Sequence, residues 1–127
     1  MNENLKFENE SVYSVLSTDQ TGKPFDRVLI GSFVIIPKSK VATPFDLSER
    51  EWVDTKKMID IIKQYLDEKY NPDGYNLGWN VGKVAGQEVP HAHLHVIPRF
   101  IDEPFAGKGI RYWLKQKENI RSSNIAE

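Results

Sequence analysis

Apolar residues recur at helical spacing over one stretch of the chain, residues 48–70, with lysine and glutamate residues between them. The recurring residues are Trp52, Met58, Ile61, Ile62 and Leu66. Ser48 and Glu51 have the spacing of a capping box, in which each side chain accepts a hydrogen bond from the other residue's backbone N–H. The sequence NPDG at residues 71–74 is typical of a helix stop. The pattern predicts one long helix over residues 48–70.

Four other stretches are rich in β-branched and aromatic residues, which is typical of strands. They are residues 11–17, 27–38, 75–82 and 91–98. Gly31 and Ser32 interrupt the longest of these runs and indicate a bulge or a close approach of the backbone to a neighbour. The glycine-containing stretches between the strands, 18–26 and 83–90, are expected to be loops. The order β-β-α-β-β predicts the α+β class, with an antiparallel sheet packed on one long helix.

Length and composition are those of a single domain. The chain has 127 residues, of which 39% are apolar and 28% charged, and its formal net charge is −1. This balance argues against a nucleic-acid polymer as partner, and no apolar run approaches the roughly 20 residues of a membrane span. The first ten residues, MNENLKFENE, are too polar for a signal peptide, so a cytoplasmic protein is expected. The absence of cysteine excludes disulfides and thiolate metal sites.

All three histidines of the chain, His91, His93 and His95, lie on alternate positions of one predicted strand. Successive side chains of a strand point to opposite faces, so the three imidazoles share one face and the apolar residues between them share the other. Three interpretations compete. In the first, the strand carries polar residues outward and they have no function. In the second, two of the histidines and a third ligand from elsewhere hold zinc. In the third, one imidazole attacks an electrophile while its neighbours hold charge or pass protons.

The loop before the histidines favours the third interpretation. Gly82 and Gly86 let the backbone approach a ligand closely, and exposed amides beside such glycines can hold phosphate oxygens. Asn80 and Gln87 add neutral donors and acceptors that suit ribose or phosphate oxygens. A turn with two glycines is common without any ligand, so the inference depends on the loop and the imidazoles together. Together they predict a phosphate site.

The stretch NVGKVAGQEVPHAHLHVIPR, residues 80–99, resembles the signature of the histidine triad (HIT) nucleotide hydrolases and transferases, His-φ-His-φ-His-φ-φ with φ apolar. The strand VIIPK at residues 34–38 and the predicted long helix also lie where the family has them. The resemblance covers about residues 28–99. It implies a HIT-like α+β fold, an antiparallel sheet of about five strands packed on one long helix.

The resemblance also implies an organisation for the whole chain. Residues 1–127 would form a single HIT-like domain, with a core over residues 11–99 and a C-terminal extension over residues 100–127. In the family two such domains join their sheets, so a homodimer is expected. The family chemistry requires no metal and no cofactor, which disfavours the zinc interpretation.

The resemblance assigns catalytic roles to the three histidines. His93 matches the nucleophile, which attacks the α-phosphorus of a nucleotide, expels the leaving group and forms a nucleotidyl-histidine that water cleaves. The backbone carbonyl of His91 matches the group that fixes the tautomer of the nucleophile, and His95 matches a residue that touches the α-phosphate and helps proton transfer. The implied substrate-binding residues are Asn80, Gln87 and Gly86.

The implied function is hydrolysis or transfer at the α-phosphate of a nucleoside 5′-phosphate derivative, with an AMP-containing dinucleoside polyphosphate or phosphoramidate as the expected substrate. The alternative is a nucleotide-binding sensor or interaction protein on a HIT scaffold, with little catalysis. Ser32 keeps the alternative open, because it stands where the family usually has a histidine beside the triad, and a hydroxyl cannot share a proton near neutral pH.

The stretch PFAGKGIRYW, residues 104–113, allows two interpretations. Lys108 and Arg111 would bring positive charge to a polyphosphate. Alternatively, the stretch is a loop whose aromatic residues, Tyr112 and Trp113, pack at a dimer interface.

Overall fold

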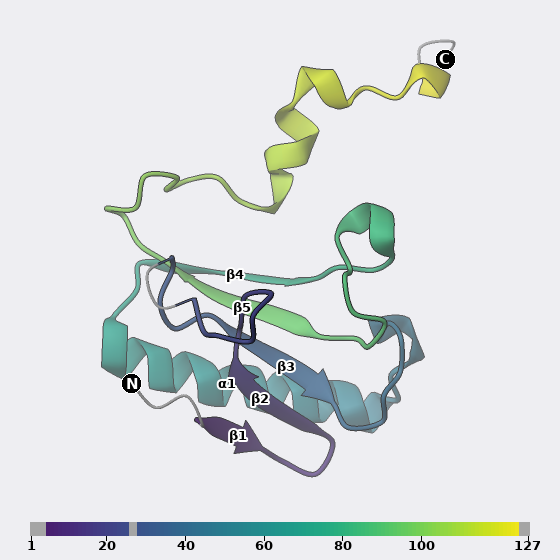
Figure 1. Cartoon of the computed structure of the whole chain (residues 1–127). Coiled ribbons are helices and arrows are strands. Elements are labelled where there is room, and N and C mark those ends of the chain that lie inside the picture. The colour runs from purple at the N-terminus through teal and green to yellow at the C-terminus, as the bar shows by residue number, and fades with distance from the viewer. Residues whose placement is uncertain (1–4, 26–27, 125–127) are drawn as a thin grey trace.

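One antiparallel sheet of five strands forms the centre of the molecule (Figure 1). The computed structural model describes residues 5–25 and 28–124. In spatial order the strands are β1, β2, β3, β5 and β4. Their bounds are Lys6–Glu8 (β1), Val12–Leu16 (β2), Phe33–Pro37 (β3), Gly74–Trp79 (β4) and Leu94–Arg99 (β5). The predicted α+β architecture is confirmed.

The long helix α1 runs over Glu49–Tyr70 and lies across one face of the sheet (Figure 1). Its capping box is complete: the Glu51 backbone N–H donates to the Ser48 hydroxyl over 3.2 Å, and the Ser48 backbone N–H donates to the Glu51 carboxylate over 2.8 Å. At the other end Asn71 adopts a left-handed conformation, with φ of 49°, and ends the helix. The predicted helix and its cap are therefore confirmed.

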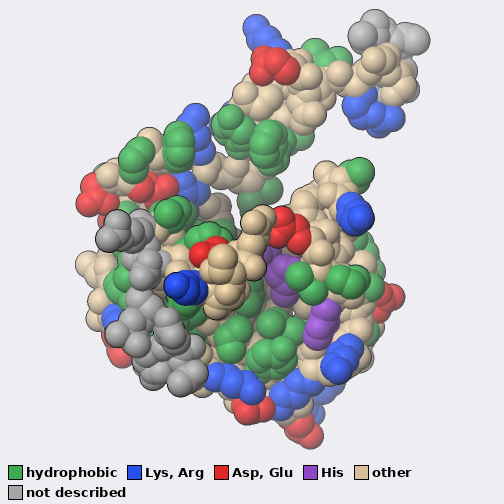
Figure 2. All heavy atoms as spheres, viewed as in Figure 1, with side chains coloured by type: hydrophobic (Ala, Val, Ile, Leu, Met, Phe, Trp, Pro, Cys, Tyr) green, Lys and Arg blue, Asp and Glu red, His purple; other side chains and the backbone are tan. Residues whose placement is uncertain are grey.

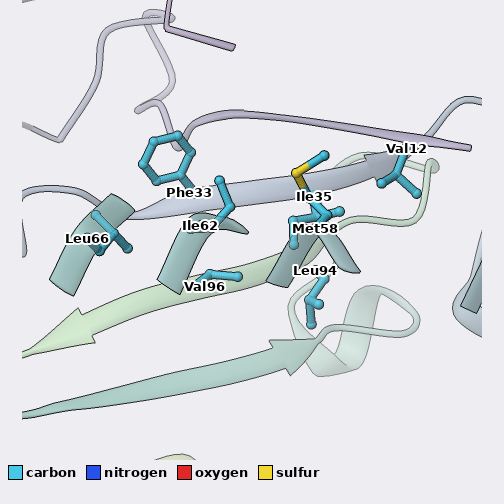
Figure 3. Close-up of a cluster of buried hydrophobic side chains, with 8 residues drawn as sticks. All are labelled: Val12, Phe33, Ile35, Met58, Ile62, Leu66, Leu94 and Val96. Atoms are coloured by element: carbon cyan, nitrogen blue, oxygen red, sulfur yellow. The ribbon is translucent and has the colours of Figure 1, made fainter. Parts of the chain in front are cut away.

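The hydrophobic core lies between α1 and the sheet (Figure 3). Its fully packed side chains come from one stripe of the helix and from alternate strand positions, as burial of one face requires. They are Val12, Phe33, Ile35, Met58, Ile62, Leu66, Leu94 and Val96. Two members of the predicted helical stripe, Trp52 and Ile61, remain exposed at the rim instead. The Trp52 ring packs edge-on against Trp79 of β4, 5.8 Å away.

The predicted strand over residues 27–38 is shorter in the structure, where β3 begins only at Phe33; residue 27 lies outside the described residues. The reason is Gly31, whose φ is +89° and whose backbone lies close against α1. A Cβ atom there would lie 2.9 Å from side-chain atoms of both Leu66 and Tyr70. The predicted close approach of the backbone is confirmed.

The strand β1 was not predicted, because Lys6-Phe7-Glu8 is short and contains only one apolar residue. That residue, Phe7, packs with Phe33 and Tyr65 in a cluster of three rings whose centroids lie 5.4 to 6.0 Å apart. The pairing depends on these distant partners rather than on a local pattern. The sheet therefore extends one strand beyond the predicted core at residues 11–99.

Residues 100–124 contain only short 3₁₀ turns, at Ile110–Lys115, Lys117–Asn119 and Ser122–Asn124, and they extend away from the sheet (Figure 1). Arg99, at the end of β5, fastens the start of this segment. Its guanidinium pairs with the Glu103 carboxylate at 2.6 Å and donates to the carbonyls of Phe105 and Lys108. None of the helices in residues 5–25 and 28–124 combines the length with the apolar character that a transmembrane segment requires.

Candidate active site

The three histidines lie on the face of the sheet that is turned away from α1. Only His95 lies within β5; His91 and His93 occupy the extended stretch just before the strand begins. The alternation of side chains nevertheless continues through the whole stretch. Ala92 and Leu94 are buried in the core, with 1% and 4% exposure, while the three imidazoles are half-buried on the other face. The predicted division of the stretch into two faces is confirmed.

Backbone carbonyls fix the tautomers of two imidazoles. The Nδ1 atom of His93 lies 2.9 Å from the carbonyl oxygen of His91, and the Nε2 atom of His91 lies 2.8 Å from the carbonyl oxygen of Pro37. A carbonyl oxygen can only accept a hydrogen bond, so the proton of neutral His93 is on Nδ1 and its Nε2 carries the lone pair. The arrangement leaves His93 with a nucleophilic nitrogen on the side of the ring away from the backbone.

The His95 ring lies next to that of His93, with ring centroids 4.9 Å apart in an edge-on arrangement. In the sheet, His95 is opposite Val34 on one side and Gly78 on the other. Burial, and to a lesser extent the neighbouring His93, lowers the pKa of His95 below its usual value of 6.5. His95 is therefore a neutral imidazole near pH 7, able to accept a proton beside His93.

The histidines line a hollow of about 670 Å³ on this face of the sheet. Figure 2 shows histidine side chains beside a group of hydrophobic side chains there. The apolar wall of the hollow comes from two facing pairs of β2 and β3, Tyr13 with Ile36 and Val15 with Val34. A volume of this size lies within the usual range for small-molecule sites of about 300–1,000 Å³.

Another side of the hollow comes from the loop that leads into the histidines and is polar apart from Val89. Asn80, Gly86 and Glu88 line it. Gly86 has a φ of +103°, and a Cβ atom there would lie 3.3 Å from the Asn80 amide nitrogen. Glycine therefore allows both the left-handed turn and the close approach of Asn80. Of the predicted site residues, the structure brings together the three histidines, Asn80 and Gly86.

Gln87 lies outside the lining of the hollow. Its amide nitrogen donates to the Ala42 carbonyl and its amide oxygen accepts from the Gly82 N–H, both over 2.8 Å. The Gln87 backbone N–H also donates to the Gly82 carbonyl, over 3.0 Å. Gln87 thus closes the loop on itself and joins it to the chain that follows β3. Its predicted contact with phosphate stays a prediction.

Ser32 and the C-terminal segment lie apart from the triad hollow. The Ser32 hydroxyl donates to the Leu29 carbonyl over 2.7 Å and lines a different cavity, between β3 and the end of α1. Lys108 and Tyr112 line a further hollow with Arg99 and Glu103. Neither interpretation of residues 104–113 is tested by these contacts.

Sequence reasoning missed two parts of the site. The apolar wall had a signal in the sequence, because the strand face that does not pack on a helix is apolar as well. Its residues are Tyr13 and Val15 of β2 and Val34 and Ile36 of β3. Glu88, which follows Gln87 directly, had none. Among the described residues, no group of three histidine, aspartate or glutamate side chains is placed to hold a metal ion.

The fold and the triad together define a class of protein. A family model for the HIT domain matches residues 27–102, more than half of the chain. The chain belongs to the HIT domain family. A HIT family protein from Bacillus anthracis has a similar structure, with a TM-score of 0.65 and 29% identity, over 94% of this chain and 80% of that one.

Two relatives give the family context. A bis(5′-adenosyl)-triphosphatase of Dictyostelium discoideum is 38% identical over 72 residues, which are 57% of this chain and 48% of that protein. An uncharacterised HIT-like protein of Methanocaldococcus jannaschii is 32% identical over 98 residues, or 74% of this chain and 67% of that protein. The aligned region thus spans about half the length of the triphosphatase.

Proposed function

We propose that the protein hydrolyses or transfers the nucleotidyl group of a nucleoside 5′-phosphate derivative, with His93 as the nucleophile. The observation that carries the proposal is the tautomer of His93, whose Nδ1 proton is bound to the His91 carbonyl and whose Nε2 lone pair belongs to a ring lining the hollow. An uncharged imidazole with a fixed tautomer is a competent nucleophile at neutral pH.

The proposed reaction has two steps. His93 Nε2 forms a bond to the α-phosphorus while the bond from phosphorus to the leaving group breaks, and the leaving atom keeps the electron pair and takes up a proton. A water molecule then attacks the phosphorus, the nitrogen–phosphorus bond breaks, and its electron pair returns to Nε2. The proton on the leaving atom comes from solvent. His95, neutral and 4.9 Å from His93 between ring centroids, is suited to accept the proton that the attacking water releases in the second step.

The shape of the hollow supports a nucleotide as substrate. Its apolar wall suits a nucleobase, and its polar side, with Asn80 and the Gly86 turn, suits ribose and phosphate oxygens. The names of the relatives support dinucleoside polyphosphates as the substrate class, because they include a bis(5′-adenosyl)-triphosphatase and an asymmetrical bis(5′-nucleosyl)-tetraphosphatase of Schizosaccharomyces pombe.

The test is a His93→Gly variant assayed on diadenosine triphosphate and on adenosine 5′-phosphoramidate. Loss of the nucleophile should lower turnover on the order of 10³-fold or more while AMP binding survives. Added imidazole should restore part of the activity, because it supplies the missing ring. In the wild type, intact mass after a denaturing quench at alkaline pH, where a nitrogen–phosphorus bond is stable, should show a nucleotidyl adduct.

The Gln64→Ala variant is the control, since its side chain is exposed on α1 and lies outside the lining of the hollow. Full activity of His93→Gly without imidazole would refute the role of His93. Micromolar AMP binding by the wild type with no turnover of either substrate would favour the alternative of a nucleotide-binding sensor.

We also propose a homodimer that joins two sheets through β4. This strand is an edge of the sheet, and Leu77 and Trp52 beside it are 43% and 45% exposed. Light scattering should give twice the chain mass for the wild type. It should give the monomer mass for Leu77→Lys, with Ile101→Lys, which changes an exposed turn residue, as the control. A monomeric wild type contradicts the proposal.

A further inference from the structure

The hollow beside the triad has an unusual charge for a site that accepts phosphates. Among its described lining residues there is no lysine and no arginine, and Glu88 is the one carboxylate. Figure 2 shows an acidic side chain next to a histidine on this face. Phosphate sites ordinarily supply lysine or arginine to offset the charge of the ligand. Here the described walls supply three imidazoles, the Asn80 amide and one carboxylate.

The position of Glu88 is fixed on both sides along the chain. Before it, the Gln87 side chain ties the loop to Ala42 and Gly82. After it, the Ala92 backbone N–H donates to the Val41 carbonyl over 2.8 Å. The exposed Glu88 side chain therefore starts from a stretch of backbone that is anchored at both ends and that places it at the rim of the hollow.

We propose that Glu88 is a specificity-determining residue, which makes the site prefer substrates that carry their own positive charge beside the α-phosphate. A bare polyphosphate is repelled by the carboxylate. The carboxylate does not repel a leaving group that carries an ammonium ion, nor a polyphosphate with a bound divalent cation. In both cases the positive charge would lie between the Glu88 carboxylate and the negative charge of the phosphate. Repulsion of the wrong ligand is a common source of specificity. The inference rests on the proposed nucleotide function.

The first arm of the test compares two adenosine 5′-phosphoramidates, one made with propylamine and one with 1,3-diaminopropane, which adds a terminal ammonium ion. The wild type should show the higher kcat/KM for the charged probe. In Glu88→Gln the ratio of the two values should fall by about three- to tenfold, which is the effect of removing one nearby charge in a partly solvated site.

The second arm measures hydrolysis of diadenosine triphosphate with Mg²⁺ and with EDTA. Stimulation by Mg²⁺ should be smaller in Glu88→Gln than in the wild type, by a similar factor. A change confined to the first arm identifies an ammonium ion as the preferred cation, and a change confined to the second identifies the metal. Unchanged ratios in both arms would overturn the proposal, as would an equal loss of kcat on all substrates.

A binding measurement keeps the charge argument separate from catalysis. Calorimetric titration should show that Glu88→Gln binds AMP about three- to tenfold more tightly than the wild type, with adenosine affinity unchanged, and the difference should shrink at high salt. This result is expected even if no substrate is turned over, in which case the proposed catalysis fails and the role of Glu88 stands. Equal AMP affinity would refute that role.

The control for both experiments is Glu68→Gln, which removes the same charge from an exposed position on α1, on the other side of the sheet from the hollow. Its substrate ratios and AMP affinity should match the wild type. If Glu68→Gln shifts them as much as Glu88→Gln does, the effect comes from net charge and the assignment to Glu88 is wrong.

Discussion

Replacement of Gly31 by alanine should destabilise the protein more than any comparable glycine substitution outside the site. Gly31 has a φ of +89°, a conformation that alanine adopts only with strain, and a Cβ atom built there would lie 2.9 Å from both Leu66 Cδ2 and Tyr70 Cε2. Leu66 is fully buried, so it cannot move aside without disturbing the core. The Tyr70 ring is half-buried and can yield only partly.

The expected loss can be built from three contributions. The left-handed conformation costs about 1–2 kcal/mol, and forcing an extra methyl group into a packed region costs about 1–3 kcal/mol. Loss of chain entropy in the unfolded state offsets about 0.4–1 kcal/mol of this. Together they predict that Gly31→Ala lowers the free energy of unfolding by about 3 kcal/mol.

Urea denaturation followed by tryptophan fluorescence measures the change, and two other glycines separate its causes. Gly22 has a φ of +84° with nothing near a built Cβ, so Gly22→Ala should cost about 1 kcal/mol from conformation alone. Gly74 has neither feature, and Gly74→Ala should change stability by less than about 0.5 kcal/mol. If Gly31→Ala costs no more than Gly22→Ala, the close packing against α1 is refuted.

Three further predictions concern the site and its supports. The pKa of His95 is below 6.5 in the folded protein, so as the pH drops the unfolded chain takes up a proton at this residue before the folded one does. The free energy of unfolding should therefore fall as the pH drops from 6.5 toward the lower, folded pKa. The midpoint of urea denaturation should fall less over this range in His95→Gln than in the wild type. Arg99→Met leaves the largely buried Glu103 carboxylate unpaired and should lower the free energy of unfolding by about 3 kcal/mol. The double variant Arg99→Met with Glu103→Leu should regain part of this stability. An Arg99→Met variant as stable as the wild type would refute the role of the pair. Gln87→Met removes two hydrogen bonds and should speed amide exchange in the adjoining loop about tenfold, while unchanged exchange would deny its fastening role.

The features that could be predicted best from the sequence are those determined by residues close to one another along the chain. The helix over 49–70 was found because its cap is local: Ser48 and Glu51 satisfy each other three residues apart. The strand β1 was missed because its pairing is not local. Its apolar residue, Phe7, is held by Phe33 and Tyr65, which lie far away in the sequence.

The candidate site follows the same division. Alternation alone placed the three imidazoles on one face, and the bond from His93 to the His91 carbonyl spans only two residues. The second bond, from His91 to the Pro37 carbonyl, spans 54 residues and joins β3 to the stretch before β5. No local pattern contains that contact, because it exists only once β3 and β5 have paired.

The core and the site are two faces of the same strands, and this limits how each can change. The stretch that buries Ala92 and Leu94 against α1 must, by the alternation of a strand, turn His93 and His95 to the opposite face. A slip of one residue would bury the imidazoles and expose the core residues together. The packing of the core therefore also fixes the orientation of the triad, whereas Glu88 lies outside the strand and its orientation is not tied to the core in this way.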